Sequence, residues 1–146
     1  MNGDTALHYA IKNNALNVID KLCVEKIDFT LSNNEGFNML HYAAFVGNVH
    51  ATKRLVTQVP HLVDMKMEDG NAALHLAALK GHREVAAILL SQNGGRAEVD
   101  LRNNLGQTPL SEEFIVIYIV FKLCFKTTAQ VSKILVFEIT KCFLRE

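Results

Sequence analysis

Three histidines, His8, His41 and His75, recur at near-constant spacing and are the residues of this sequence best suited to chemistry. Imidazole is a common metal ligand, but the ligands of one ion must converge on a single point. Steps of 33 and 34 residues instead place the three side chains in a row, if each belongs to one unit of a stack. We therefore predict no metal site, and we expect each histidine to tie its own helix start to the neighbouring turn by hydrogen bonds.

No other combination of residues predicts catalysis. Acidic residues occur singly on the expected turns and helix faces, so no paired general acid and base is visible. The glycines fall one per turn, without the strand–loop–helix context of a phosphate cradle. Cys23 lies on an apolar stripe and is expected in the core. The sequence thus predicts a protein without catalytic residues, metal or other cofactor, and without a small-molecule substrate.

Length and composition narrow the classes of protein further. A chain of 146 residues is enough for one domain with a buried core. Fifteen basic and fifteen acidic residues balance, which gives no electrostatic attraction for nucleic acid or for an anionic membrane. The three cysteines are too widely spaced for a disulfide framework or a zinc cluster, and the amino terminus carries no signal segment. We expect a cytoplasmic protein that binds neither nucleic acid nor membrane.

The histidines belong to a repeated segment. The best-formed copy, residues 70–90, reads GNAALHLAALKGHREVAAILL and predicts a turn, a short helix, a break at Gly81 and a second helix. Related openings begin at Gly3 (GDTALHYA), Gly36 (GFNMLHYAA) and Gly106 (GQTPLS). The leucine of this motif falls at positions 7, 40, 74 and 110, in steps of 33, 34 and 36. A period of this length indicates a solenoid of stacked helix pairs.

The expected fold is an all-α solenoid over residues 1–110. Its units are about 3–35, 36–69 and 70–105, joined by hairpin loops, with a partial fourth unit at 106–110. The motif begins with a polar turn and lacks a polar capping unit before it, which favours a fragment of a longer array.

Helix-end signals differ between the units. Thr5 can cap the first helix through its hydroxyl, which is also placed to reach the ring of His8. Asn13 and Asn14 stand where a glycine usually ends this helix, and asparagine tolerates the left-handed conformation better than most residues. Asn38 and Ala72 replace the threonine of the motif, so we expect weaker capping in the second and third units.

Residues 111–146 form a tail of different character. Ser111 replaces the expected histidine, and 114–121 are eight consecutive apolar residues, far fewer than a bilayer-spanning helix needs. Because the repeat breaks in mid-motif, we favour translated non-coding or frame-shifted sequence after a true repeat boundary. A divergent capping helix over the third unit is one alternative, and a membrane-associated tether is another.

The remaining candidate for function is a protein-binding surface. In a solenoid of this kind the turn tips and the outer side of each first helix form a concave face. Apolar residues there, rimmed by charge, are typical of a site for a protein partner. The predicted partner-binding residues are Phe37, Tyr42, Phe45, Val46, Asn71, Leu79 and Lys80. The alternative is that the tyrosines and leucines of the motif pack between neighbouring units.

Residues 3–110 resemble ankyrin repeats, whose motif T-P-L-H-x-A matches the segments quoted above. A narrower resemblance is to the mind bomb E3 ubiquitin ligases. It rests on residues 31–44 (LSNNEGFNMLHYAA), 63–70 (VDMKMEDG) and 73–79 (ALHLAAL), and on a long loop around Pro60 where that family also has one.

The second resemblance implies a part in the ubiquitination of Notch ligands such as Delta, which promotes their endocytosis. In that family zinc-bearing RING modules recruit the ubiquitin-charged E2, and this sequence lacks the clustered cysteines and histidines that such modules need. No catalytic or zinc residue of the family can be assigned here, so the repeats would be a non-catalytic spacer and interaction platform. A generic ankyrin scaffold unrelated to ubiquitin is the alternative.

Overall fold

The structure is a computed structural model that describes residues 3–91 and 97–109. Its helices are α1 (Ala6–Lys12), α2 (Leu16–Val24), α3 (Met39–Val46), α4 (Val49–Gln58), the 3₁₀ turn η1 (Pro60–Leu62), α5 (Ala73–Lys80) and α6 (Arg83–Leu90). The described ranges contain no strand and no helix long and apolar enough to cross a membrane. The predicted tail of residues 111–146, and with it the tether and capping hypotheses, lies outside them.

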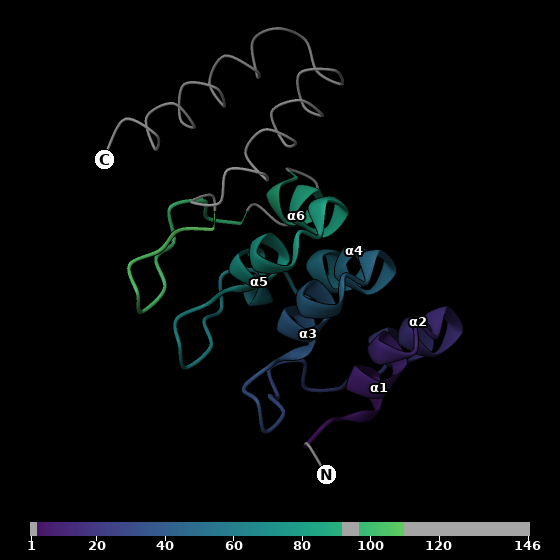
Figure 1. The fold of residues 1–146 in the computed structure, drawn as a ribbon. Coiled ribbons are helices and arrows are strands. Elements are labelled where there is room, and N and C mark those ends of the chain that lie inside the picture. The colour runs from purple at the N-terminus through teal and green to yellow at the C-terminus, as the bar shows by residue number, and fades with distance from the viewer. Residues whose placement is uncertain (1–2, 92–96, 110–146) are drawn as a thin grey trace, which may run out of the picture.

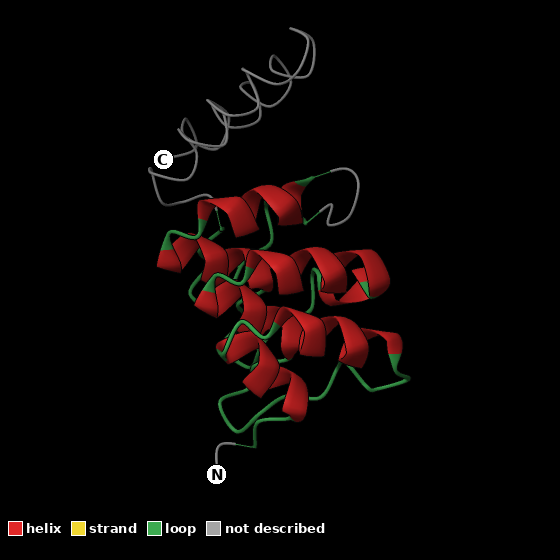
Figure 2. Cartoon of the chain, turned by 90° about the vertical axis from the view of Figure 1, so that its right-hand side faces the viewer, coloured by secondary structure: helices red, strands yellow, loops and turns green. Residues whose placement is uncertain are grey.

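The α-helices form three pairs stacked in chain order, which confirms the all-α repeat solenoid (Figure 1). α1, α3 and α5 make one layer, α2, α4 and α6 make the other, and the loops that join the pairs extend beyond the first layer (Figure 1). A view turned by 90° shows the helices one above another, with the loops at the edges (Figure 2).

The first helix of a pair has little polar surface when other helices pack against several of its sides, as they do for α3. In α3 every side chain from Met39 to Ala44 is buried, since α3 contacts α1, α4 and α5. Ala43 and Ala44 have no exposed surface, and their small size lets the neighbouring helices approach closely. The second helices instead carry an apolar stripe on one side. α4 buries Ala51, Leu55 and Val56 and leaves its other face polar.

Three tight turns join the units, as the sequence predicts. In each, an amide N–H donates to a carbonyl four residues ahead: Asn33 to Phe37, Met67 to Asn71 and Asn103 to Gln107. A glycine in the left-handed region closes each turn, at Gly36, Gly70 and Gly106.

The residues at the helix N-termini contradict one expectation about capping and confirm another. Asn38 Oδ1 accepts from the His41 amide at 2.9 Å, so the second unit is capped at least as well as threonine would cap it, and the prediction of weaker capping is wrong there. Ala72 has no side-chain acceptor, and capping in the third unit is weaker, as predicted. Asn14 adopts φ 51°, the left-handed conformation expected of it.

Alanine at Gly47 is expected to cost more stability than alanine at Gly81. Both glycines end a first helix with positive φ, 77° and 70°, so each substitution carries a strain of about 1 kcal/mol. A Cβ on Gly47 would also lie 2.6 Å from Nδ1 of His82, whereas no described residue lies within 4 Å of one on Gly81. We expect Gly47→Ala to lose about 1–2 kcal/mol more in urea unfolding of the full chain. Equal losses would show that the His82 ring is not held against the turn.

Candidate protein-binding surface

The three repeated histidines bridge neighbouring units, which confirms the role predicted for them. Each ring Nε2 donates to a carbonyl of the following loop: His8 to Phe37 at 3.0 Å, His41 to Met65 at 2.8 Å and His75 to Gln107 at 3.1 Å. Each ring Nδ1 accepts from the backbone amide three residues earlier, at 3.1, 3.4 and 3.2 Å. These bonds fix the neutral tautomer with the proton on Nε2. The part of the chain that the structure describes holds no group of three or more residues that could bind a metal ion.

Acid is expected to destabilise the stack through His41 and His75. Burial lowers the pKa of both imidazoles below the ordinary 6.5. The unfolded chain therefore binds protons at a pH where the folded chain does not, so stability is complete above about pH 7 and falls as the pH drops through 6.5. We expect thermal unfolding of the full chain at a lower temperature at about pH 5.5 than at about pH 7.5.

His41→Gln should lower stability at the higher pH and weaken the pH dependence, because a titrating group is lost. The matched control is His61→Gln, since His61 is exposed on η1. A pH dependence that His61→Gln alters and His41→Gln does not would contradict this account.

An aromatic cluster of Phe37, Tyr42 and Phe45 lies where the first two units meet. The Phe37 ring lies 6.1 Å from Tyr42 and 5.0 Å from Phe45, and Tyr42 packs edge-on against His8 at 5.3 Å. Phe37 and Tyr42 are only 8% and 9% exposed. Burial, with the nearby carboxylates of Asp4 and Glu35, raises the pKa of Tyr42. Tyr42 thus joins the first two units, and Phe37 packs against both Tyr42 and Phe45 within the second unit.

Four predicted residues do reach solvent on neighbouring first helices, and we call Phe45, Val46, Leu79 and Lys80 the inner-helix patch. Phe45 is half-buried, Val46 is 37% exposed and Leu79 is 61% exposed. The Lys80 ammonium lies 4.4 Å from the centre of the Phe45 ring, a cation–π contact that joins α5 to α3. The patch is therefore continuous across two units.

Asn71, the remaining predicted residue, links two loops. Its Oδ1 accepts from Asn103 at 3.0 Å, and its Nδ2 donates to Asp69 at 2.8 Å. The backbone amide of Asn104 adds a bond to the Asp69 carbonyl at 3.0 Å. The side chain of Asn71 thus orders the row of turns beside the first helices.

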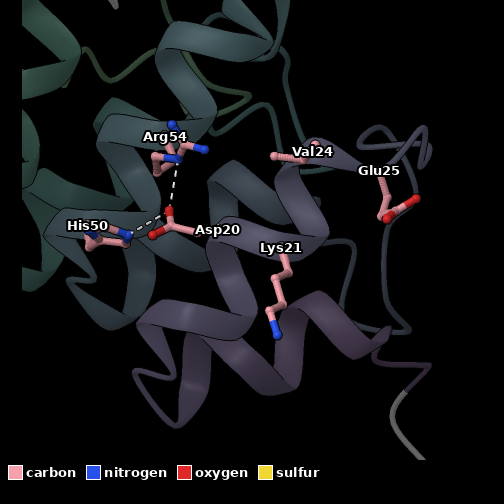
Figure 3. A pocket seen from close by; sticks show the side chains of 6 residues that line it. All are labelled: Asp20, Lys21, Val24, Glu25, His50 and Arg54. Atoms are coloured by element: carbon pink, nitrogen blue, oxygen red, sulfur yellow. Dashed lines mark hydrogen bonds and ion pairs between the residues drawn. The ribbon is translucent and has the colours of Figure 1, made fainter.

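Sequence reasoning missed an outer pocket between α2 and α4. It has a volume of about 670 Å³ and carries both signs of charge, with Asp20 and Glu25 beside Lys21 and Arg54 (Figure 3). Asp20 Oδ1 lies 3.0 Å from His50 Nε2 and 2.9 Å from Arg54 Nε, so its charge is already partnered (Figure 3). These side chains are about 40% exposed, and such surface pairs contribute at most about 1 kcal/mol each.

A groove between two helix–helix turns was also missed. It lies between the α1–α2 turn and the α3–α4 turn and has a volume of about 570 Å³. Its lining includes Lys12, Leu16, Val46 and Lys53, drawn from four helices. The available signal was that equivalent positions one period apart must lie side by side in a stack.

The chain belongs to the ankyrin repeat family, since a family model of three ankyrin repeats matches residues 1–61 and 40–112. Ankyrin repeats are non-catalytic modules that bind other proteins.

Among curated proteins, the chain is 34% identical over 111 residues to the SMC5-SMC6 complex localization factor protein 1 of Bos taurus. The matched region covers 75% of this chain and 10% of that protein. It is 35% identical over 107 residues to a transient receptor potential cation channel subfamily A member 1 homolog of Caenorhabditis elegans, covering 73% and 9%. Over 45 residues it is 51% identical to the E3 ubiquitin-protein ligase MIB2 of Gallus gallus, covering 31% and 5%. The chain spans about a tenth of the length of the first two relatives and less of the third.

Proposed function

We propose that the chain docks a protein partner on its inner-helix patch and carries out no reaction itself. The observation that carries this proposal is the exposure of Leu79, at 61%, next in sequence to Lys80, whose ammonium contacts the half-buried Phe45 ring. Burying the rest of a leucine side chain contributes about 1–2 kcal/mol, and an aromatic anchor adds to it. Lys80 supplies a charge at the edge, the arrangement of an apolar centre with a polar rim.

Phe37, Tyr42 and Asn71 belong to the proposed site as supporting residues. Because Phe37 and Tyr42 are mostly buried, they hold Phe45 in place and offer a partner little surface. Asn71 fixes the loops beside the patch through its bond to Asn103. We place the partner on the face that the first helices and the loop row form together, the concave face expected of such a solenoid.

We further propose that this module serves a mind bomb-like E3 ubiquitin ligase that acts on Notch ligands such as Delta. The support is the 51% identity to MIB2 of Gallus gallus over 45 residues, together with the loop and helix motifs of residues 31–44 and 63–79. In such a ligase the repeats would be the spacer and interaction platform between other modules. A cytoplasmic location follows from this assignment.

The alternative is an ankyrin scaffold unrelated to ubiquitin. It is favoured by the longer matches, at 34% and 35% identity, to the SMC5-SMC6 complex localization factor and to the cation channel homolog. A patch of the kind described would serve either role.

A domain exchange separates these two functions. The stretch of MIB2 that matches this chain is replaced by the corresponding part of the chain, and ubiquitination of Delta is measured in cells that lack the native ligase. The control carries the matching repeats of the Bos taurus localization factor in the same place. We expect ubiquitination to be retained with this chain and lost with the control. Equal activity of the two chimeras, or loss in both, would contradict the mind bomb assignment.

A further inference from the structure

The groove between the two helix–helix turns has the features of a binding site for an extended segment. It runs across the first and second units and has a volume of about 570 Å³. Leu16 and Val46, which line it, are 43% and 37% exposed, so apolar surface faces the groove from both units. Val46 also belongs to the inner-helix patch, so the groove continues that surface toward the turns.

The floor of the groove is held in place by hydrogen bonds. Asn48 is only 7% exposed, and its Nδ2 donates to the Ile11 carbonyl at 3.0 Å and to Asn14 Oδ1 at 3.2 Å. Its Oδ1 accepts from the Ala51 amide at 2.9 Å, which fixes the start of α4. The side chain of Asn48 therefore clamps the two turns at a set separation, and a ligand would meet a preformed groove.

The permanent charges that line the groove have one sign. Lys12 and Lys53 line it and no acidic residue does, while His50, also in the lining, is bonded to Asp20. Asp20 pairs with His50 and Arg54 on the outer side of α4, and within residues 3–91 and 97–109 neither lysine has a carboxylate partner. The outer pocket next to it contrasts, because Asp20 and Glu25 balance its basic residues (Figure 3).

We propose that this groove binds an acidic linear peptide, with a hydrophobic side chain against Leu16 and Val46 and carboxylates toward Lys12 and Lys53. The inference rests on the proposed interaction function and names the chemistry of one partner segment. The net charge of the chain is zero, so selectivity for an acidic peptide must come from this local arrangement rather than from a general attraction.

The test uses the full chain and a labelled ten-residue peptide of aspartate and glutamate with one central leucine. Its control has asparagine and glutamine in place of the acids. We expect the acidic peptide alone to bind in fluorescence anisotropy, and its affinity to fall with added salt. The double variant Lys12→Gln/Lys53→Gln should bind about five- to tenfold more weakly, since each surface ion pair contributes up to about 1 kcal/mol. Leu16→Ser should weaken binding as well.

The matched control is Lys21→Gln/Lys26→Gln, which removes two exposed lysines outside the groove and should leave affinity unchanged. Circular dichroism confirms that each variant is folded. Equal binding of the acidic and amide peptides, or an effect of the control pair as large as that of Lys12 and Lys53, would overturn the proposal. Either failure leaves Phe45, Leu79 and Lys80 as the proposed docking site, because none of these three residues lines the groove.

Discussion

Replacing Tyr42 by alanine is expected to lower the free energy of unfolding by about 3 kcal/mol, whereas the same change at Tyr9 costs at most about 0.5 kcal/mol. The two tyrosines occupy the same position of the motif, one period apart. Tyr42 is 9% exposed and packs against His8 and Phe37, so its removal leaves a cavity between two units. Tyr9 is 53% exposed and leaves none.

Urea unfolding of the full chain measures both losses. The comparison removes the same side chain from the same kind of helix, so differences in helix propensity cancel. Similar losses of unfolding free energy for the two variants would mean that packing of Tyr42 does not stabilise the contact between the first and second units. Phe45 would then lack the support on which the proposed binding surface depends.

The second prediction concerns the contact between neighbouring helix–helix turns, which the repeats make with two different pairs of residues. In the α1–α2 turn Asn14 accepts a hydrogen bond from Asn48, whose Nδ2 also donates to the Ile11 carbonyl at 3.0 Å. In the α3–α4 turn the His82 ring packs against Gly47, and its Nε2 donates to the Phe45 carbonyl at 3.1 Å. The two acceptors lie one position apart in the motif, since Ile11 corresponds to Ala44, so asparagine and histidine make similar bridges between neighbouring turns. The histidine ring leaves no room for a Cβ at the turn, because one on Gly47 would lie 2.6 Å from it.

Asn48→Ala should cost about 2 kcal/mol, since it removes the cap of α4 and the side-chain bond to the Ile11 carbonyl, which keeps its backbone donor Asn14. Asn48→His alone should also destabilise, because the ring meets the Cβ of Asn14. The double variant Asn14→Gly/Asn48→His should regain at least about half of that loss by reproducing the α3–α4 turn.

A double-mutant cycle in urea unfolding gives the coupling energy between the two positions. Asn14→Gly alone serves as the control, and we expect it to change stability by less than about 1 kcal/mol. Additive effects of Asn14→Gly and Asn48→His would contradict the proposed steric pairing of the turns.

The repeat period predicts those features that recur with it. The helix pairs, the hairpin turns and the histidine bridges follow because each contact joins one unit to the next in the same register. His8 and His75 bond the loop residue that follows the turn glycine, as the period requires. His41 departs from this pattern and bonds Met65, in the loop lengthened by η1. That loop also buries Leu62 and Val63, which the sequence alone did not place in the core.

The exposure of the candidate site could not be predicted in the same way. The motif H-Y-A places Tyr9 and Tyr42 identically within a unit, yet only Tyr42 meets a described unit on the side of the preceding repeat. The patch and the groove likewise depend on side chains about one period apart, such as Phe45 with Lys80 and Ile11 with Asn48. Their types are visible in the sequence, but their distances and burial arise only when the units stack.

A comparison of Leu79→Gln with Val24→Gln shows whether the inner-helix patch binds a protein partner. Both residues are exposed leucine or valine side chains on helices, 61% and 72% exposed, but Leu79 lies in the inner-helix patch and Val24 lies on α2 in the other layer (Figure 1). The tagged full chain and each variant are expressed in cells at equal levels, and the captured proteins are quantified by mass spectrometry.

We expect at least one protein whose recovery falls about tenfold with Leu79→Gln, the effect of losing about 1.4 kcal/mol, while Val24→Gln retains it. Circular dichroism of both variants should match that of the unchanged chain. If every captured protein is recovered equally with Leu79→Gln, or is lost only with Val24→Gln, the inner-helix patch is not the binding surface.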